Sequence, residues 1–406
     1  MNKGFVIIFL TIATLLFSEL TIGQTQDTVK TSKNAESRKW FEVISLRGYG
    51  QVRYNRLLET NDKLGCDQCD KSWGDGGLFI RRMRLVFYGW VNERLYFYVQ
   101  PDFASSSGST LNYLQLRDAF VDLGIDRENV FRVRVGQSKV PYGFENAQSS
   151  QNRLTIDRSD GTNSAFVNER DLGVFFYWTP KIVQERFETI NTLKLKGSGN
   201  FGMAGLGFFN GQGANKADLN KKQHIVGRFS YPLLFGKQFI EPGIQAYTGD
   251  FTMPSDLLSN GVKTNLDKTY KDERIGATLV IYPQPIGIQA EYNIGRGPQY
   301  NKQTDSIEVR NLRGGYITLN AKATINKDDL IYPYLKYNYY DGGKKFEKDA
   351  RSYLVKEFEA GIEWQPNKFL ELVVAYTISD RTYEDFVLRD NRQKGNLVRI
   401  QAQFNF

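Results

Sequence analysis

The chain has 406 residues, of which 41% are hydrophobic and 14% aromatic, with 37 glycines and a formal net charge of +8. A helical membrane protein needs runs of about 20 apolar residues, and no segment beyond the N-terminus approaches that length. The composition favours a membrane protein built of strands instead, because every second residue of such a strand can be polar.

The N-terminus has the pattern of a secretory signal peptide. Lys3 supplies a positive charge, and a short apolar run at residues 5–17 is followed by the small residue Gly23. We expect residues 1–23 to be removed on export. A membrane anchor or a buried helix is the alternative. Residues 24–41 are polar and are expected to form a mobile periplasmic lead-in.

Strand-like segments recur from residue 43 to the end of the chain. Strands are predicted near residues 43–54, 79–90, 95–103, 114–123, 131–138, 172–178, 201–209, 225–231, 239–248, 275–282, 286–294, 315–324, 331–339, 358–365, 370–377 and 397–406. Residues 180–196 are the weakest part of this count of about sixteen. An even number of strands puts short turns at the periplasmic end, and we expect the long connections to lie consistently at the other end.

The final residues, 398–406, alternate apolar and polar side chains and stop at Phe406. One face of this strand suits lipid and the other suits a watery lumen, as in the closing strand of a barrel. Aromatic girdles are expected at strand ends, from Trp90, Tyr282 and Trp364. We therefore predict a transmembrane antiparallel β-barrel over residues 42–406, in the outer membrane of a Gram-negative bacterium. A soluble antiparallel sandwich would show the same alternation.

Basic side chains recur on the polar faces of the predicted strands and in one long connection. The candidates for pore lining and anion binding are Arg47, Arg53, Arg82, Arg84, Arg132, Arg134, Lys139, Arg153, Arg158 and Arg170. Lys322 and Lys336 also lie on polar faces, and Asp102, Asp118 and Asp122 oppose a purely basic lining. Salt screens charges beyond about 8 Å, so a basic wall selects anions only where the pore is narrow.

The connection over residues 141–170 is the predicted constriction. It contains Pro141, Gly143, Glu145, Asp157 and Asp160, together with three of the candidate arginines. Connections of this length are usually functional or disordered, and the mixed charge and aromatic content favours a folded loop that turns into the lumen. The alternative is that these are solvated loop charges or contacts to anionic lipopolysaccharide.

Other chemical motifs are weak. Cys66 and Cys69 lie in the first outer loop, where an oxidising compartment favours a local disulfide over a zinc site that would lack a second ligand pair. His224 is the only histidine, and Ser230 follows it without a nucleophile motif. We therefore expect no catalytic residues, no metal, no cofactor and no nucleic-acid partner.

Four segments resemble a known family, namely RRMRLVFYGWVNERLYFYVQPDF at 81–103, LRDAFVDLG at 116–124, FRVRVGQSKVPYGFE at 131–145 and ERDLGVFFYW at 169–178. They look like the phosphate-selective porin O and P family. The most specific element is the spacing of Gly136, Pro141, Gly143 and Glu145. The resemblance implies a sixteen-stranded porin with an inward third loop, assembly as a homotrimer, and passage of anions along arginines and lysines.

The sequence thus predicts an outer-membrane porin for passive diffusion of small hydrophilic solutes, with anions such as phosphate favoured. Outer-membrane lipid and lipopolysaccharide are the expected surroundings of the barrel. The alternative is a non-conducting barrel that serves as an adhesin or as a subunit of a secretion or uptake complex.

Overall fold

The computed structural model describes residues 40–58, 77–107, 110–326 and 329–406. The predicted signal peptide, nearly all of the lead-in, and both cysteines lie outside this described part, so the structure leaves those predictions as they stand. The short helix α2 (Trp40–Val43) precedes the first strand. Residues 43–406 form one structural unit.

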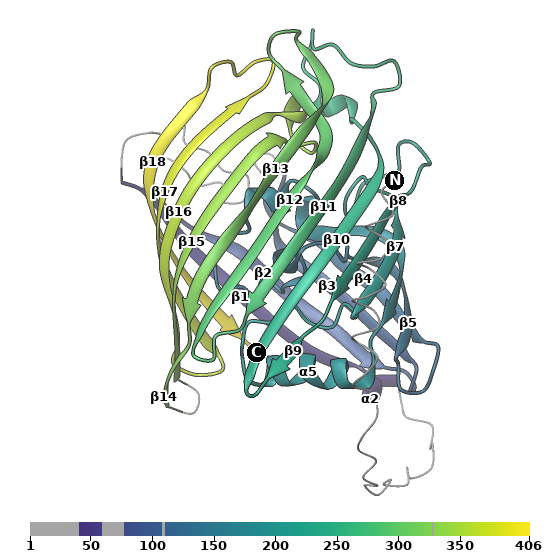
Figure 1. Ribbon diagram of the computed structural model, residues 1–406, viewed down its shortest axis with the longest axis vertical. Helices are drawn as coiled ribbons and strands as arrows, with labels where there is room; N and C mark the ends of the chain where they lie inside the picture. The colour runs from purple at the N-terminus through teal and green to yellow at the C-terminus, as the bar shows by residue number, and fades with distance from the viewer. Residues whose placement is uncertain (1–39, 59–76, 108–109, 327–328) are drawn as a thin grey trace, which may run out of the picture. The chain divides into compact units, whose positions relative to one another are not determined.

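This unit is a ring of antiparallel strands (Figure 1). The strands are β1 (Ser45–Leu57), β2 (Gly77–Trp90), β3 (Leu95–Ser107), β4 (Thr110–Gly124), β5 (Phe131–Lys139), β6 (Arg170–Trp178), β7 (Ala204–Phe209), β8 (His224–Ser230), β9 (Leu233–Phe235), β10 (Gln238–Thr252), β11 (Thr269–Ile281), β12 (Ile286–Asn301), β13 (Ser306–Ala321), β14 (Ala323–Asn326), β15 (Asp329–Gly343), β16 (Ser352–Gln365), β17 (Leu370–Glu384) and β18 (Arg392–Asn405). Because β8 and β9 both pair with β10, and β13 and β14 both pair with β15, these elements make sixteen transmembrane strands. The predicted antiparallel barrel is confirmed.

The ring closes where β1 pairs with both β2 and β18. Gly50 lies opposite Phe404 in this register, and a Cβ atom built on Gly50 would come within 2.1 Å of the Phe404 ring. A Cβ on Gly48 would come within 2.5 Å of the Phe406 ring. Glycine is required at both positions because the terminal aromatic rings rest directly on the backbone of β1.

Side chains alternate between lipid and lumen along each strand. In β11, Ile275 and Leu279 are exposed on the outside, whereas Tyr270, Asp272 and Arg274 are buried on the inside. Hydrocarbon favours the outer set, and the polar inner set can be hydrogen-bonded within the lumen. The same two-residue period that predicted the strands therefore also sets which residues can contact a solute.

The outer wall differs between its two halves. On the β11–β18 side, ion pairs lie on the outer surface: Arg296 with Glu273 at 2.7 Å, Arg313 with Asp341 at 3.4 Å, and Arg392 with Asp380 at 2.8 Å. In the described residues of β2 to β8, no charged side chain is exposed. Most of the exposed side chains there are apolar, for example Leu78, Ile80 and Leu172.

Several short helices interrupt the connections: α3 (Phe144–Ala147), α4 (Asp160–Asn163), η1 (Val167–Glu169), η2 (Ser255–Leu257) and η3 (Lys348–Ala350). A longer helix, α5 (Lys181–Thr192), follows β6. Within the described ranges, no helix is both long enough and apolar enough to cross a bilayer.

Two details of the sequence-based prediction are wrong. The connections on either side of β6, residues 140–169 and 179–203, are both long and necessarily leave opposite ends of that strand. Long connections therefore lie at both ends of the barrel. Tyr282, expected in an aromatic girdle, is only 1% exposed, because its hydroxyl faces inward and donates to Glu241 Oε2 at 2.5 Å.

Candidate permeation site

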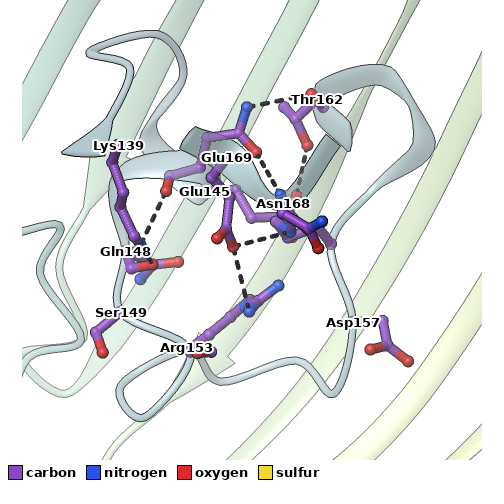
Figure 2. A network of polar contacts seen from close by, with 12 residues as sticks. Lys139, Glu145, Gln148, Ser149, Arg153, Asp157, Thr162, Asn168 and Glu169 are labelled. Atoms are coloured by element: carbon purple, nitrogen blue, oxygen red, sulfur yellow. Dashed lines mark hydrogen bonds and ion pairs between the residues drawn. The ribbon is translucent and has the colours of Figure 1, made fainter. Parts of the chain in front are cut away.

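The third loop, residues 140–169 between β5 and β6, lies among the inward side chains of distant strands. Asp157 bonds Arg53 of β1, Asp160 bonds Arg381 of β17, and Glu145 bonds Lys336 of β15. These strands lie in one arc of the ring, β15 to β18 and β1, whereas the loop leaves from β5 and returns to β6, so the loop spans the lumen. Figure 2 shows the loop and its polar network in front of the barrel strands.

Glu145 is one anchor of this loop and is 1% exposed. Lys336 Nζ donates to Glu145 Oε1 at 2.6 Å, while the backbone N–H and the hydroxyl of Ser159 donate to Oε2 at 2.7 and 2.9 Å. Burial alone would raise the pKa of Glu145, but the charges of Lys336 and Arg153 outweigh it and lower that pKa below its ordinary value of 4.5. The carboxylate is therefore ionised at neutral pH and holds the start of the loop.

Asp157 and Asp160 are the second pair of anchors. Asp157 Oδ2 accepts from Arg53 Nη1 at 2.9 Å and from Arg399 Nη1 at 2.8 Å. Asp160 is paired with Arg381 at 2.9 Å and with Lys344 at 2.8 Å. Each buried carboxylate thus has two cationic partners from the wall or from the loop that follows β15, an arrangement that offsets the cost of burial.

Glu169 gathers the arginines at the end of the loop. Arg158 Nε lies 3.2 Å from it, Arg153 lies at 4.0 Å, and Arg170 donates to its other oxygen. Burial alone would raise the pKa of Glu169. The positive charges of Arg158 and Lys139 are the strongest opposing effects, and together with the neighbouring arginines they lower this pKa well below its usual range. Burial lowers the pKa of Arg158 to about 10, which leaves that side chain charged at neutral pH.

The loop itself is not basic. Residues 140–169 contain four carboxylates, Glu145, Asp157, Asp160 and Glu169, and only two cations, Arg153 and Arg158. The positive charges that balance these carboxylates come from side chains of the barrel wall.

Many of the candidate wall arginines are themselves paired with carboxylates. Arg84 bonds Asp102 at 2.8 Å, Arg134 bonds Asp122 at 2.7 Å, and Arg170 bonds Asp118 at 2.9 Å. A paired guanidinium has little net attraction left for a passing ion, so the row of arginines is largely a row of ion pairs.

Arg82 is the exception, and Arg153 approaches a carboxylate only at 4.0 Å, in Glu169. Arg82 Nη1 donates to Gln51 Oε1 at 2.7 Å, and within the described part of the chain no carboxylate lies at salt-bridge distance from Arg82. The charged groups that act most strongly on Arg82 are Arg81, Arg153 and Arg84, all cations. Arg153 is only 6% exposed, and its three nitrogens have no hydrogen-bond acceptor among the described residues. This part of the lumen carries uncompensated positive charge and unused donors.

The remaining candidates have local roles. Lys139 is buried, and its Nζ donates to the carbonyls of Asn146, Ala147 and Gln148 (Figure 2). Arg132 Nη2 donates to the Asn200 carbonyl at 3.1 Å, and Arg132 also lies 3.5 Å from Asp122. Arg47 is exposed and donates to Gln151 at 3.2 Å.

The Pro141–Glu145 segment turns the chain into the lumen. Gly143 has a φ of 79°, and a Cβ there would lie 2.5 Å from Glu291 Oε1. The backbone N–H groups of Phe144 and Glu145 donate to Glu291 Oε2 at 2.9 and 3.4 Å. Glycine is needed here both for the left-handed backbone and for the close approach of this carboxylate.

Sequence reasoning missed Arg274, Arg381 and Arg399 as partners of the loop. Arg274 Nη1 donates to the Gly161 carbonyl at 3.2 Å and to Ser164 Oγ at 2.8 Å. The two-residue alternation of β18 indicates that Arg399 faces the lumen, because Arg399 lies between outward-facing Val398 and Ile400. Which carboxylate each arginine meets, however, depends on the path of the loop.

A closed antiparallel barrel, apolar outside and charged inside, with a loop spanning its lumen, defines an outer-membrane porin. Residues 66–406 match the family described as phosphate-selective porin O and P. The chain therefore belongs to this family, and the protein is a channel of the Gram-negative outer membrane. A search of curated proteins finds no match.

Solved structures agree on the fold. The outer-membrane channel DcaP of Acinetobacter baumannii is 13% identical with a TM-score of 0.54, over 89% of this chain and 97% of that one. OmpF of Salmonella typhi, solved with daunomycin, is 12% identical with a TM-score of 0.54 over the same shares. An anion-selective porin from Comamonas acidovorans is 14% identical with a TM-score of 0.51, over 89% of this chain and 99% of that one.

Proposed function

We propose that this porin passes small anions, phosphate among them, by passive diffusion through a lumen narrowed by the third loop. The observation that carries the proposal is the positive charge of Arg82, which has no carboxylate partner among the described residues, together with the unused donors of Arg153. The phosphate-selective description of the family and the anion-selective neighbour support the same preference.

The physical basis is replacement of hydration. An anion about 5 Å from a guanidinium gains about 3 kcal/mol at an effective dielectric near 20. Arginine also presents paired donors that fit phosphate and carboxylate oxygens. The surrounding acids Asp102, Asp157 and Glu169 keep the total charge small, so the anion is attracted and can leave again.

The test is the reversal potential of the purified protein in planar bilayers under a KCl gradient. Wild-type protein should favour chloride. Arg82→Gln and Arg153→Gln should each lower the chloride-to-potassium permeability ratio about two- to ten-fold, because each removes a positive charge from the lumen. Arg296→Gln is the matched control, since it removes the same charge from the outer wall. Inorganic phosphate should reduce the chloride current. An Arg82→Gln variant with unchanged selectivity would remove this residue from the filter.

We also propose a homotrimer in the membrane. What supports it is the outer wall from β2 to β8, where the described strands expose no charged side chain. Such a wall suits burial against a second copy, whereas the ion pairs on the β11–β18 side suit lipid headgroups and lipopolysaccharide. Native mass spectrometry of the detergent-extracted protein should show three chains; a single chain would contradict the proposal.

A non-conducting barrel is the second candidate, because the third loop occupies the lumen. Planar-bilayer recording separates the two functions directly. Open-channel current supports the porin, and a barrel that inserts without any current supports a surface or complex-forming role.

A further inference from the structure

Residues 193–203 enter the lumen from the end opposite to the third loop. They follow α5, and their backbone is held by side chains from the far wall: Lys322 Nζ donates to the Leu193 carbonyl at 2.5 Å, and Tyr332 OH donates to the Lys194 carbonyl at 2.7 Å. The segment begins after β6 and returns to β7, whereas these partners lie beside β14 and on β15. It therefore reaches across the barrel.

Helix α5 fastens this insertion at its base. Val183, Phe187 and Ile190 recur on one face of the helix, and all three are buried. They pack with Phe239, Val280 and Tyr282 of the wall region and with Phe144 of the third loop. Figure 1 shows α5 lying at the end of the barrel where the chain terminates. An apolar anchor of this kind resists displacement by salt.

The insertion and the third loop touch each other. Gln148 Nε2 of the third loop donates to the Lys196 carbonyl at 2.6 Å, and Phe144 packs in the same cluster as Leu195. Both segments are thus in the path of any solute that crosses the lumen.

The charge around the insertion differs from that around the third loop. Lys196 is 7% exposed, pairs with Glu363 of β16, and lies 4.8 Å from the Tyr332 ring. Gln365 Nε2 donates to Glu363 at 2.6 Å and to Glu371 at 3.0 Å, so two carboxylates face one lysine. Without Lys196 the carboxylate of Glu363 would be left without its cation and would repel an anion.

We infer that residues 179–203 form a second constriction in series with the third loop, and that Lys196 determines whether anions pass it. This inference rests on the proposed function, because it concerns the same conducting path. Lys196 offsets the charge of Glu363, and this pairing also holds the segment across the lumen. The apolar face of α5 thus anchors the constriction at one side, and the ion pair of Lys196 with Glu363 holds it at the other.

The experiment records single-channel conductance and reversal potential for the full-length protein in KCl. Lys196→Gln should lower the chloride-to-potassium permeability ratio about two- to five-fold. The double variant Lys196→Gln, Glu363→Gln should restore most of that ratio, since it removes one charge of each sign. Lys194→Gln is the matched control because it removes a neighbouring positive charge from the same segment.

A second variant tests the obstruction itself. Replacement of residues 181–202 by a short glycine–serine turn should raise conductance at least about two-fold, because it opens the path beneath the third loop. If this variant does not fold, the point variants still decide the role of Lys196. Anion-selective wild-type current with unchanged selectivity in Lys196→Gln would overturn the inference and leave the proposed function intact. Absence of wild-type current would instead remove the proposed function.

Discussion

The third loop and the insertion at residues 179–203 occupy the same lumen but are held there by different forces. The third loop is fixed by buried carboxylates that meet wall cations, as in Glu145 with Lys336. The insertion is fixed mainly by the apolar face of α5, with one ion pair at Lys196. The difference teaches that a pore can be narrowed by charge pairing or by hydrophobic anchoring, and that the two respond to different perturbations.

The largest expected effect comes from breaking one anchor of the third loop. Glu145→Ala leaves Lys336 buried without its partner, which costs about 3–5 kcal/mol in comparable buried pairs. We expect a lower thermal unfolding midpoint by circular dichroism in detergent, and noisy single-channel current as the loop detaches. Arg313→Ala breaks an exposed outer pair and should change stability by less than about 1 kcal/mol. Equal losses in both variants would contradict the anchoring role.

Loss of the apolar anchor of the insertion should have a local effect on structure. Phe187→Ala removes a buried ring, with a cost of about 3 kcal/mol or more. The loss should be local, so limited proteolysis should cut within residues 179–203 faster than in the wild type. Glu188→Ala changes the adjacent exposed residue and provides the control. A barrel that unfolds globally without local cleavage would show that the two segments are not separately held.

A smaller effect is expected from the paired arginines. Arg132→Glu combined with Arg134→Glu adds negative charge beside Asp122 and should shift reversal potential toward cations. Arg134→Gln alone should shift it less than Arg82→Gln does, because Asp122 already compensates Arg134. Reversal potentials measured at one salt concentration give this ranking. The opposite order would show that paired arginines select as strongly as unpaired ones.

The smallest effect is expected from mild acid. The pKa of Glu145 lies below 4.5 and that of Asp157 lies below 3.8, since wall cations outweigh the effect of burial in both cases. Groups with lowered folded-state pKa values stabilise the fold above their unfolded values and lose that contribution as pH falls through the folded ones. The anchoring by Glu145 and Asp157 should therefore persist from about pH 8 to about pH 5 and be lost only in stronger acid, as measured by the thermal unfolding midpoint in detergent. A wild type that loses its stability advantage over Glu145→Ala within that range would contradict the pairing of Glu145.

The barrel could be predicted from sequence because alternation is local. A two-residue period with Ile275 and Leu279 on one face and Arg274 on the other is visible without any tertiary information. The insertion was harder to predict. Val183, Phe187 and Ile190 have helical spacing, and residues 180–196 are therefore the weakest part of a prediction that counts strands.

The candidate site could be predicted only in part. Most of its charged residues are visible in sequence, yet the difference between paired Arg84 and unpaired Arg82 is not. That difference depends on the register of β2 against β3, which places Arg84 opposite Asp102. This is a property of the folded lumen rather than of any short segment.

The seam between β1 and β18 has a consequence for biogenesis. Gly48 and Gly50 receive the rings of Phe406 and Phe404, so the first strand can be completed only by the last residues of the polypeptide. β1 pairs with residues 397–405, so loss of β18 would leave one hydrogen-bonding edge of β1 bare in a hydrocarbon environment, where each such group is costly. Closure of the ring therefore depends on β18 being in place beside β1.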